Sequence, residues 1–334
     1  MPSFKTAERH LQTAYFRANH AGRIGYGNSD YRLLPEHRAM NLAPEIRDIA
    51  VPAFVEQPAI QWHQHANHGL SSQVCCVNFL LPLAHRPEVL SRWVGHVLKI
   101  PAPEMLVVER RGESDWFVAF EWIGDVDYLN EASADGSRQR GANATAADAA
   151  VKFRDEEGRT HLLLIEWKYT EEYRGHRLST DRRGTRVARY QDIAFHPNGP
   201  INTDAGLELG DFFHEPFYQL LRQQMLAWHI EQDPNSGIDR ARVLHLSPSG
   251  NRELHHVTSD RLRGFGDDAF EAFAATLVNS ADFLATSIEQ AFAPLADWAD
   301  ASWYAWLVSR YPSLCRRPAG SDECAAQSTS KLEQ

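Results

Sequence analysis

The chain has 334 residues, of which 43% are hydrophobic and 23% charged, and 44 acidic against 34 basic residues give a formal net charge of −10. This composition is typical of a globular protein and excludes a collagen, a disordered chain and a disulfide-stapled peptide. The length allows one elaborated domain or two. The acidic balance argues against non-specific binding of nucleic acid by the whole molecule. Partners respond to local fields, however, so the charge has to be considered segment by segment.

The segments that could mark export, a membrane span or a zinc site are all poor matches. The longest apolar stretch, residues 74–84, is interrupted by Asn78 and Pro82 and is shorter than the roughly 20 residues of a membrane helix. The first thirty residues lack the apolar run of a signal peptide, and the four cysteines form no CxxC pair. The sequence therefore predicts a cytoplasmic protein with reduced thiols.

The first half of the chain changes from helical to strand patterns. Residues 1–69 are polar and weakly periodic, which predicts short helices and loops. Two helical patterns follow within residues 70–98, on either side of Pro82. Residues 115–124 are rich in aromatic and β-branched side chains and predict a strand. Residues 143–153 and 161–169 predict two more strands, joined as a hairpin by a polar turn.

The second half predicts a helix at 216–232, a strand at 242–246 and two amphipathic helices within 268–307. The tail at 316–334 is rich in Ser, Ala and Gln and is expected to dangle. The predicted order is helix, three strands, helix and strand, with helical additions at both ends.

The predicted hairpin brings together Asp148 and the tripeptide Glu166-Trp167-Lys168. Because side chains alternate along a strand, Glu166 and Lys168 share one face and Trp167 points to the other. A turn centred near Glu157 places Asp148 directly opposite Glu166, with Cβ atoms about 4.5–5.5 Å apart. A slip of one residue would move Asp148 to the opposite face. The hairpin thus predicts two carboxylates and one ammonium at a single place.

Two carboxylates opposite one another destabilise a sheet unless a cation lies between them. Mg²⁺ prefers one or two carboxylates together with water and phosphate oxygens. The alternative is structural: Asp148 ends a strand and Glu166 pairs with Lys168. The apolar run from Leu162 to Ile165 predicts a central strand, where charged residues are rarely buried without a partner, and this favours a metal site.

An Asp at the end of one strand followed by Glu-x-Lys on the next resembles the PD-(D/E)XK, or restriction-endonuclease-like, nuclease superfamily. More narrowly, the chain resembles a branch of uncharacterised restriction endonucleases over residues 65–250. The motif alone is degenerate, but its placement on a hairpin followed by a helix and a strand strengthens it. The matching stretches are residues 68–73, 120–123, 140–149, 164–171 and the helix at 218–224.

The resemblance implies that Asp148 and Glu166 bind Mg²⁺ or Mn²⁺, that the main-chain carbonyl of Trp167 completes the metal site, and that Lys168 is the catalytic lysine. It also implies a further polar group, for which Glu121 and Gln73 are alternative candidates. Ala147 stands where the superfamily name has proline, a departure that is common among its members. The implied reaction is hydrolysis of phosphodiester bonds in DNA, with a role in restriction or defence.

The segment after the Glu-x-Lys strand departs from the global charge. Between residues 174 and 190 it holds a single acid, Asp181, and six arginines: Arg174, Arg177, Arg182, Arg183, Arg186 and Arg189. These side chains either grip the phosphate backbone or form a solvated loop that pairs with the acidic excess elsewhere. Among Tyr218, Gln219, Arg222 and Gln223 in the next helix, the sequence does not say which residue faces the site.

Other interpretations remain open. His63, His65 and His68 invite a zinc site but lack a second ligand cluster. A catalytically silent nuclease fold would bind nucleic acid or a protein partner, and paired carboxylates without metal would suit a glycosidase. Trp303, Tyr304 and Trp306 suit core packing better than base stacking.

The expected fold is an α/β restriction-endonuclease-like core with an α-β-β-β-α-β order, a mixed sheet flanked by helices. We expect an N-terminal cover at 1–69, the nuclease core at 70–250, a C-terminal helical extension at 251–315 and a disordered tail at 316–334. DNA is the expected partner, and cleavage of both strands would favour a homodimer.

Overall fold

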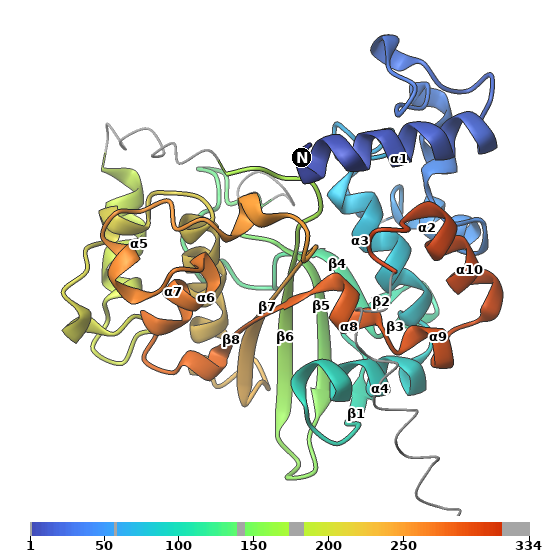
Figure 1. The fold of residues 1–334 in the computed structure, drawn as a ribbon. Coiled ribbons are helices and arrows are strands. Elements are labelled where there is room, and N and C mark those ends of the chain that lie inside the picture. The colour runs from blue at the N-terminus through green and yellow to red at the C-terminus, as the bar shows by residue number, and fades with distance from the viewer. Residues whose placement is uncertain (1, 57–58, 139–143, 174–183, 316–334) are drawn as a thin grey trace, which may run out of the picture.

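The computed structural model describes residues 2–56, 59–138, 144–173 and 184–315. Its centre is a six-stranded sheet, and a separate two-stranded ribbon lies beside it (Figure 1). The strands are β1 (Glu104–Leu106), β2 (Glu109–Arg111), β3 (Ser114–Trp116), β4 (Val118–Trp122), β5 (Ala147–Arg154), β6 (Thr160–Trp167), β7 (Arg240–Ser247) and β8 (Phe283–Ser287).

The sheet is mixed. Its order is β1-β5-β6-β7-β8. Both β1 and β4 pair with the same edge of β5: β1 pairs with residues 152–154 and β4 with residues 147–151. The β5–β6 hairpin is antiparallel, whereas β6, β7 and β8 run parallel to one another. Parallel strands need crossovers, which are usually helical, and the chain supplies α5 and α6 before β7 and α7 before β8.

Helices cover both faces of the sheet (Figure 1). One side carries α3, α4, α8 and α10, and the other carries α5, α6 and α7. The helices are α1 (Phe4–Asn19), α2 (Arg47–Ala53), α3 (Ser72–Leu80), α4 (Pro87–Leu98), α5 (Thr185–Ala194), α6 (Phe217–Gln232), α7 (Ala269–Ala275), α8 (Ile288–Phe292), α9 (Leu295–Trp298) and α10 (Ala301–Arg310). The prediction of a mixed α/β sheet flanked by helices is confirmed.

The hairpin has the predicted register. Ala149 pairs with Ile165 and Arg154 pairs with Thr160, as a turn centred near Glu157 requires. Gly158 has φ 79°, a backbone conformation that suits glycine, and its N–H closes the turn on the Asp155 carbonyl. β6 lies between two partner strands and its residues 161–167 are buried, which confirms the prediction of a central strand.

Three predictions of local structure are wrong. Residues 115–124 form parts of two strands, β3 and β4, because the chain leaves the ribbon and joins the sheet between them. The N-terminal cover contains the 16-residue helix α1, longer than expected. The extension at 251–315 is not purely helical, because it contributes β8, which pairs with β7 and lengthens the sheet.

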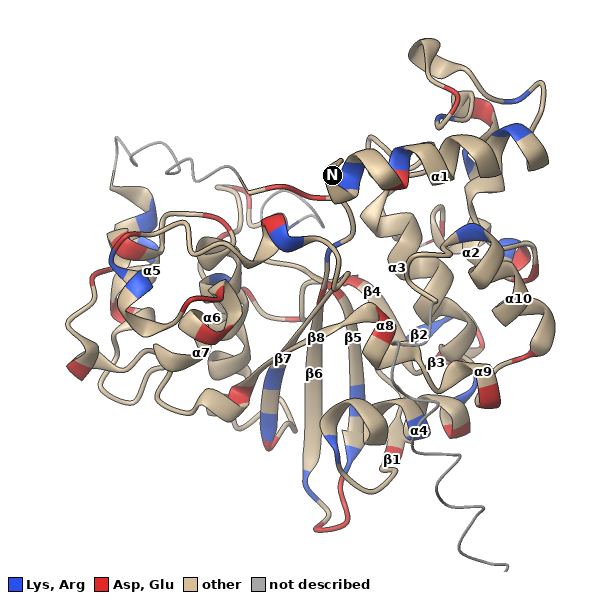
Figure 2. Ribbon diagram, in the orientation of Figure 1, with Lys and Arg blue, Asp and Glu red and all other residues tan. Residues whose placement is uncertain are grey.

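The C-terminal helix α10 belongs to the core of one side. Trp303 is buried and donates from its indole N–H to the Asn78 carbonyl at 3.0 Å, so core packing is confirmed for this tryptophan. In the described ranges, no helix is long and apolar enough to cross a membrane. Figure 2 shows basic and acidic residues interspersed over both layers. The predicted disorder of the tail concerns residues outside the described ones.

Candidate active site

A row of acidic residues crosses the sheet at one end of the hairpin. Asp148 comes directly before Ala149, and Glu166 comes directly after its partner Ile165. The register therefore places Asp148 opposite Glu166. On the other side, Phe120 pairs with Ala149 and Trp122 with Ala147, so Glu121 lies opposite Asp148. Glu166 in turn pairs with His245 of β7. We call Glu121, Asp148 and Glu166 the carboxylate row; three neighbouring strands contribute one residue each.

Glu166 is the most enclosed member of the row, with 1% of its surface exposed. Its two carboxylate oxygens accept hydrogen bonds from Gln219, at 2.5 Å, and from Gln223, and the Lys168 ammonium pairs with it. Burial raises the pKa of the Glu166 carboxyl, while Lys168 and Gln223 act in the opposite direction. The side chain is thus held in place by two neutral donors and one cation.

Asp148 accepts a backbone hydrogen bond, in which the Trp167 N–H donates to Oδ2 at 2.7 Å. Burial and the negative charge of Glu166 raise the pKa of the Asp148 carboxyl well above its usual range. Lys168 lowers this pKa and Glu121 raises it further. The row therefore concentrates negative charge, and a positive charge placed beside Asp148 would stabilise it.

Lys168 and Trp167 confirm the predicted alternation of faces. The Lys168 ammonium reaches Glu166, and the Trp167 ring packs against Phe79 and Phe292 on the other side of the sheet. Burial lowers the pKa of Lys168, but Glu166 and the other nearby acidic groups together outweigh burial and raise this pKa well above the ordinary value. The ammonium therefore remains a positive charge within the row.

Glu121 and Gln73, predicted as alternatives, are neighbours. The Gln73 amide donates to Glu121 at 2.9 Å and to the Gln61 carbonyl at 2.6 Å. The His63 ring lies 3.0 Å from the same carboxylate, which raises the pKa of the imidazole. Glu121 has φ 50°, a left-handed conformation that costs roughly 1–3 kcal/mol for a residue with a side chain. Such strain is concentrated at functional sites.

The family described as "Restriction Endonuclease associating with ARP" matches residues 8–312. The chain belongs to this family. No curated protein and no solved structure matches.

The match to a restriction endonuclease family agrees with the predicted resemblance to restriction-endonuclease-like nucleases. It extends beyond the predicted core of residues 70–250 in both directions. The family therefore includes most of α1, all of β8 and all of α10 as well as the hairpin.

Helix α6 supplies the residues that sequence reasoning could not choose. Gln219 and Gln223 are four residues apart, on one face of the helix, and both reach Glu166. Arg222 points elsewhere and donates to Glu131 at 3.1 Å and to Thr145 at 3.0 Å. The Gln-x-x-x-Gln spacing was the available signal, but the rotation of α6 about its axis depends on tertiary packing.

The family member also contains one residue at the row that sequence reasoning missed. His245 is 1% exposed, lies next to Glu166 in the register and stacks near Phe270 at 4.1 Å between ring centroids. Neither ring nitrogen has a partner among the described residues. Burial, with Lys168 nearby, lowers the pKa of this imidazole well below its usual value. Its role depends on the register of β7, which no local pattern reveals.

The arginine-rich segment is described only in part. Arg174, Arg177, Arg182 and Arg183 lie outside the described residues, so their predicted role cannot be placed on the structure. Arg186 and Arg189 lie in α5. The Arg186 guanidinium lies 5.3 Å from the centre of the Tyr218 ring, one residue before Gln219. Helix α5 is therefore adjacent to α6, the helix whose Gln219 and Gln223 donate hydrogen bonds to Glu166.

The three histidines considered as an alternative zinc site do not all come together. His65 stacks on His68 with ring centroids 4.6 Å apart, whereas His63 turns to Glu121. Within the described ranges, no group of three or more His, Cys, Asp or Glu side chains is arranged to hold a metal ion. The carboxylates of the row are nevertheless hard oxygen donors of the kind that Mg²⁺ and Mn²⁺ prefer, and their donor chemistry fits such an ion.

Proposed function

We propose that this family member is a metal-dependent nuclease that hydrolyses phosphodiester bonds in DNA, in restriction or defence. The observation that carries the proposal is the carboxylate row with Lys168 on the same side of the sheet. A structural ion pair needs one acid and one base. The row instead places Asp148 between two further carboxylates, an arrangement suited to a bound cation and an anionic substrate.

Asp148 and Glu166, with the main-chain carbonyl of Trp167, would hold Mg²⁺ or Mn²⁺. The bound ion would supply Lewis acidity at the phosphate and a more acidic water. Lys168 would stabilise negative charge on the phosphate, because its ammonium lies beside Glu166. Glu121 would add a further carboxylate, which Gln73 orients through its amide.

Gln219 and Gln223 act as positioning residues. Both donate to Glu166 and so restrict its carboxylate to one orientation, as outer partners of metal ligands generally do. Arg186 and Arg189, together with the four arginines before α5, would contact the phosphate backbone. A homodimer would supply a second active site for cleavage of the second strand.

Cleavage of supercoiled and linear DNA with Mg²⁺ or Mn²⁺ tests the proposal. Wild type is expected to cut, and Asp148→Ala and Lys168→Ala are expected to cut at least roughly 100-fold more slowly. The matched control is Glu157→Gln, at the exposed turn of the same hairpin, which is expected to cut like wild type. Chelation of the metal by EDTA should stop the reaction.

Two outcomes would contradict the proposal in different ways. If wild type leaves DNA and RNA intact with both ions, the chain is a binding module with a nuclease fold. If Asp148→Ala cuts as fast as wild type, the activity stands but the carboxylate row is not its site. A reaction that proceeds in EDTA would exclude the metal-dependent mechanism.

A further inference from the structure

A large cavity lies on the side of the sheet that α6 and Glu166 share. Its volume is about 950 Å³, at the upper end of the roughly 300–1,000 Å³ typical of small-molecule sites. Its walls include Lys152 and Leu162 from the hairpin, Ile230 from α6, and the rings of Trp122 and Tyr128. Lys152 is four residues from Asp148 along β5, a distance of roughly 13 Å. The cavity is therefore separate from the row but close to it.

Lys152 is a half-buried cation in the wall of this cavity. Its neighbours on the adjacent strands are Leu106 and Leu162. Across the part of the chain that the structure describes, the Lys152 ammonium forms no ion pair or hydrogen bond. A cation in such surroundings is stabilised by a bound anion, since burying an unpaired charge is costly.

Arg138 adds a second positive charge, and none of the ion pairs among the described residues includes it. Its guanidinium donates to the carbonyls of residues 123–126 over 2.6–3.2 Å. Arg110 and Glu109 in the same wall are paired with Asp115 and Arg111, and Asp125 contributes one negative charge. The cavity thus has an excess of positive charge in a chain whose net charge is −10.

Trp122 provides a preorganised flat wall. Gly124 has φ 69°, and a Cβ built on it would lie 3.3 Å from the indole, so the ring rests against the backbone of this loop. Arg138 holds the same loop in place by donating hydrogen bonds to the carbonyls of residues 123–126. A fixed indole is a stacking platform for a planar heterocycle such as a nucleobase.

We infer that this cavity binds a nucleotide, with the base against Trp122 and the phosphate at Lys152 and Arg138. The nucleotide has two sources: a free mononucleotide, or an unstacked nucleotide of a DNA strand that reaches the carboxylate row. Binding at this site requires no cleavage, so it can fail or succeed independently of the nuclease proposal.

Calorimetric titration of the intact chain without metal tests the inference, with dAMP, dGMP, dCMP, dTMP and inorganic phosphate as probes. A parallel arm uses a short single-stranded oligonucleotide carrying 2-aminopurine, whose fluorescence reports stacking. Lys152→Gln is expected to weaken binding at least about tenfold, and Trp122→Ala to weaken the nucleotides more than inorganic phosphate. Lys99→Gln is the matched control, because it removes the same charge outside the cavity.

The two titrations distinguish a free mononucleotide from a nucleotide of a DNA strand. Saturable binding of a mononucleotide that Lys152→Gln weakens supports a free ligand. Quenched 2-aminopurine that Lys152→Gln restores, without mononucleotide binding, supports a nucleotide of the strand. The inference is overturned if wild type binds none of the probes, or if a folded Lys152→Gln protein binds them as wild type does. Because binding is measured without metal and without cleavage, it can succeed where the cleavage assay fails, and this separates the two proposals.

Discussion

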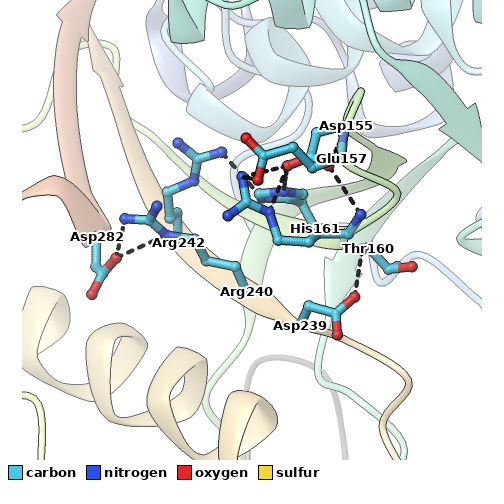
Figure 3. Close-up of polar contacts among 9 residues, drawn as sticks. Asp155, Glu157, Thr160, His161, Asp239, Arg240, Arg242 and Asp282 are labelled. Atoms are coloured by element: carbon cyan, nitrogen blue, oxygen red, sulfur yellow. Dashed lines mark hydrogen bonds and ion pairs between the residues drawn. The ribbon is translucent and has the colours of Figure 1, made fainter.

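At the open end of the β5–β6 hairpin, Asp148 faces Glu166 across the strands and Glu121 lies on its other side. At the closed end, Asp155 accepts from the His161 ring at 2.8 Å and from Arg159 at 2.9 Å. Figure 3 shows the closed end: Arg242 reaches the other nitrogen of His161, Arg240 pairs with Asp282, and Asp239 accepts from the Thr160 N–H. We call these residues the closed-end network.

The two ends place charge on one hairpin in opposite ways. In the closed-end network acids meet cations or N–H donors, so it is complete as it stands. In the carboxylate row the acids meet one another and neutral amides, with Lys168 as the cation at Glu166 and the His63 ring at Glu121. The closed-end network stabilises the fold, and this explains its charges. The carboxylate row destabilises the fold, so its charges indicate a functional role.

The sharpest test of this contrast is Asp148→Asn. Asparagine keeps the shape and the acceptor for the Trp167 N–H but removes the repulsion with Glu166 and Glu121. We expect cleavage to fall roughly 1,000-fold or more, while the thermal unfolding midpoint stays unchanged or rises. DNA cleavage and thermal unfolding measured on one preparation check both parts. A lower midpoint of several degrees would show that Asp148 stabilises the fold.

The opposite outcome is expected for His161→Ala in the closed-end network. His161 is buried, stacks on Phe153 with ring centroids 4.8 Å apart, and joins Asp155 to Arg242. Its removal leaves a cavity and unpaired polar groups, so we expect a loss of about 2–3 kcal/mol in the free energy of unfolding. Urea unfolding measures this loss. Cleavage by the folded variant should match wild type, and a large loss of cleavage would contradict the division of roles.

Much of the site was predictable because it depends on local periodicity. The turn near Glu157 sets the hairpin register, and alternation in Glu166-Trp167-Lys168 sets the faces; both predictions are confirmed. The partners of the row were not predictable. Gln223 depends on how α6 is rotated, and His245 depends on the register of a strand about 80 residues away in sequence.

The overall fold followed the same rule. The strands β4, β5, β6 and β7 and the helix α6 arise from strong strand and helical patterns, which are local. The short strands β1 and β2 precede them and were not predicted. β8 was missed because its five residues, Phe283–Ser287, carry little pattern of their own and run directly into α8. Their strand conformation comes from pairing with β7. Glu121 was only one of two candidates, since its left-handed backbone is set by the sheet around it.

The closed-end network also predicts a dependence of stability on pH. Burial and the nearby Arg242 and Arg159 lower the pKa of His161, although Asp155 opposes them. Below the ordinary histidine pKa of about 6.5, the unfolded chain therefore binds a proton that the folded chain does not. This contribution to stability is full above about pH 6.5 and declines as the pH falls.

His161→Phe isolates this contribution, because it keeps a ring against Phe153 but cannot bind a proton. Wild type should lose stability relative to this variant as the pH falls from about 7 to about 5. The unfolding free energy of wild type minus that of the variant should decrease by up to about 1.4 kcal/mol for each unit by which the pKa is lowered. Urea unfolding across this range measures the difference. A constant difference would show that His161 has the same pKa in both states.

Arg159→Ala should have the smallest effect, although Arg159 pairs with both Asp155 and Glu157 at 2.9 Å. Its side chain is half exposed, and exposed ion pairs contribute roughly 0–1 kcal/mol. We expect a loss below about 1 kcal/mol that decreases further in 0.5 M salt, because salt screens exposed charges. Urea unfolding at two salt concentrations checks this. A loss as large as that of His161→Ala would mean that the closed-end network depends on its surface cation rather than on its buried imidazole.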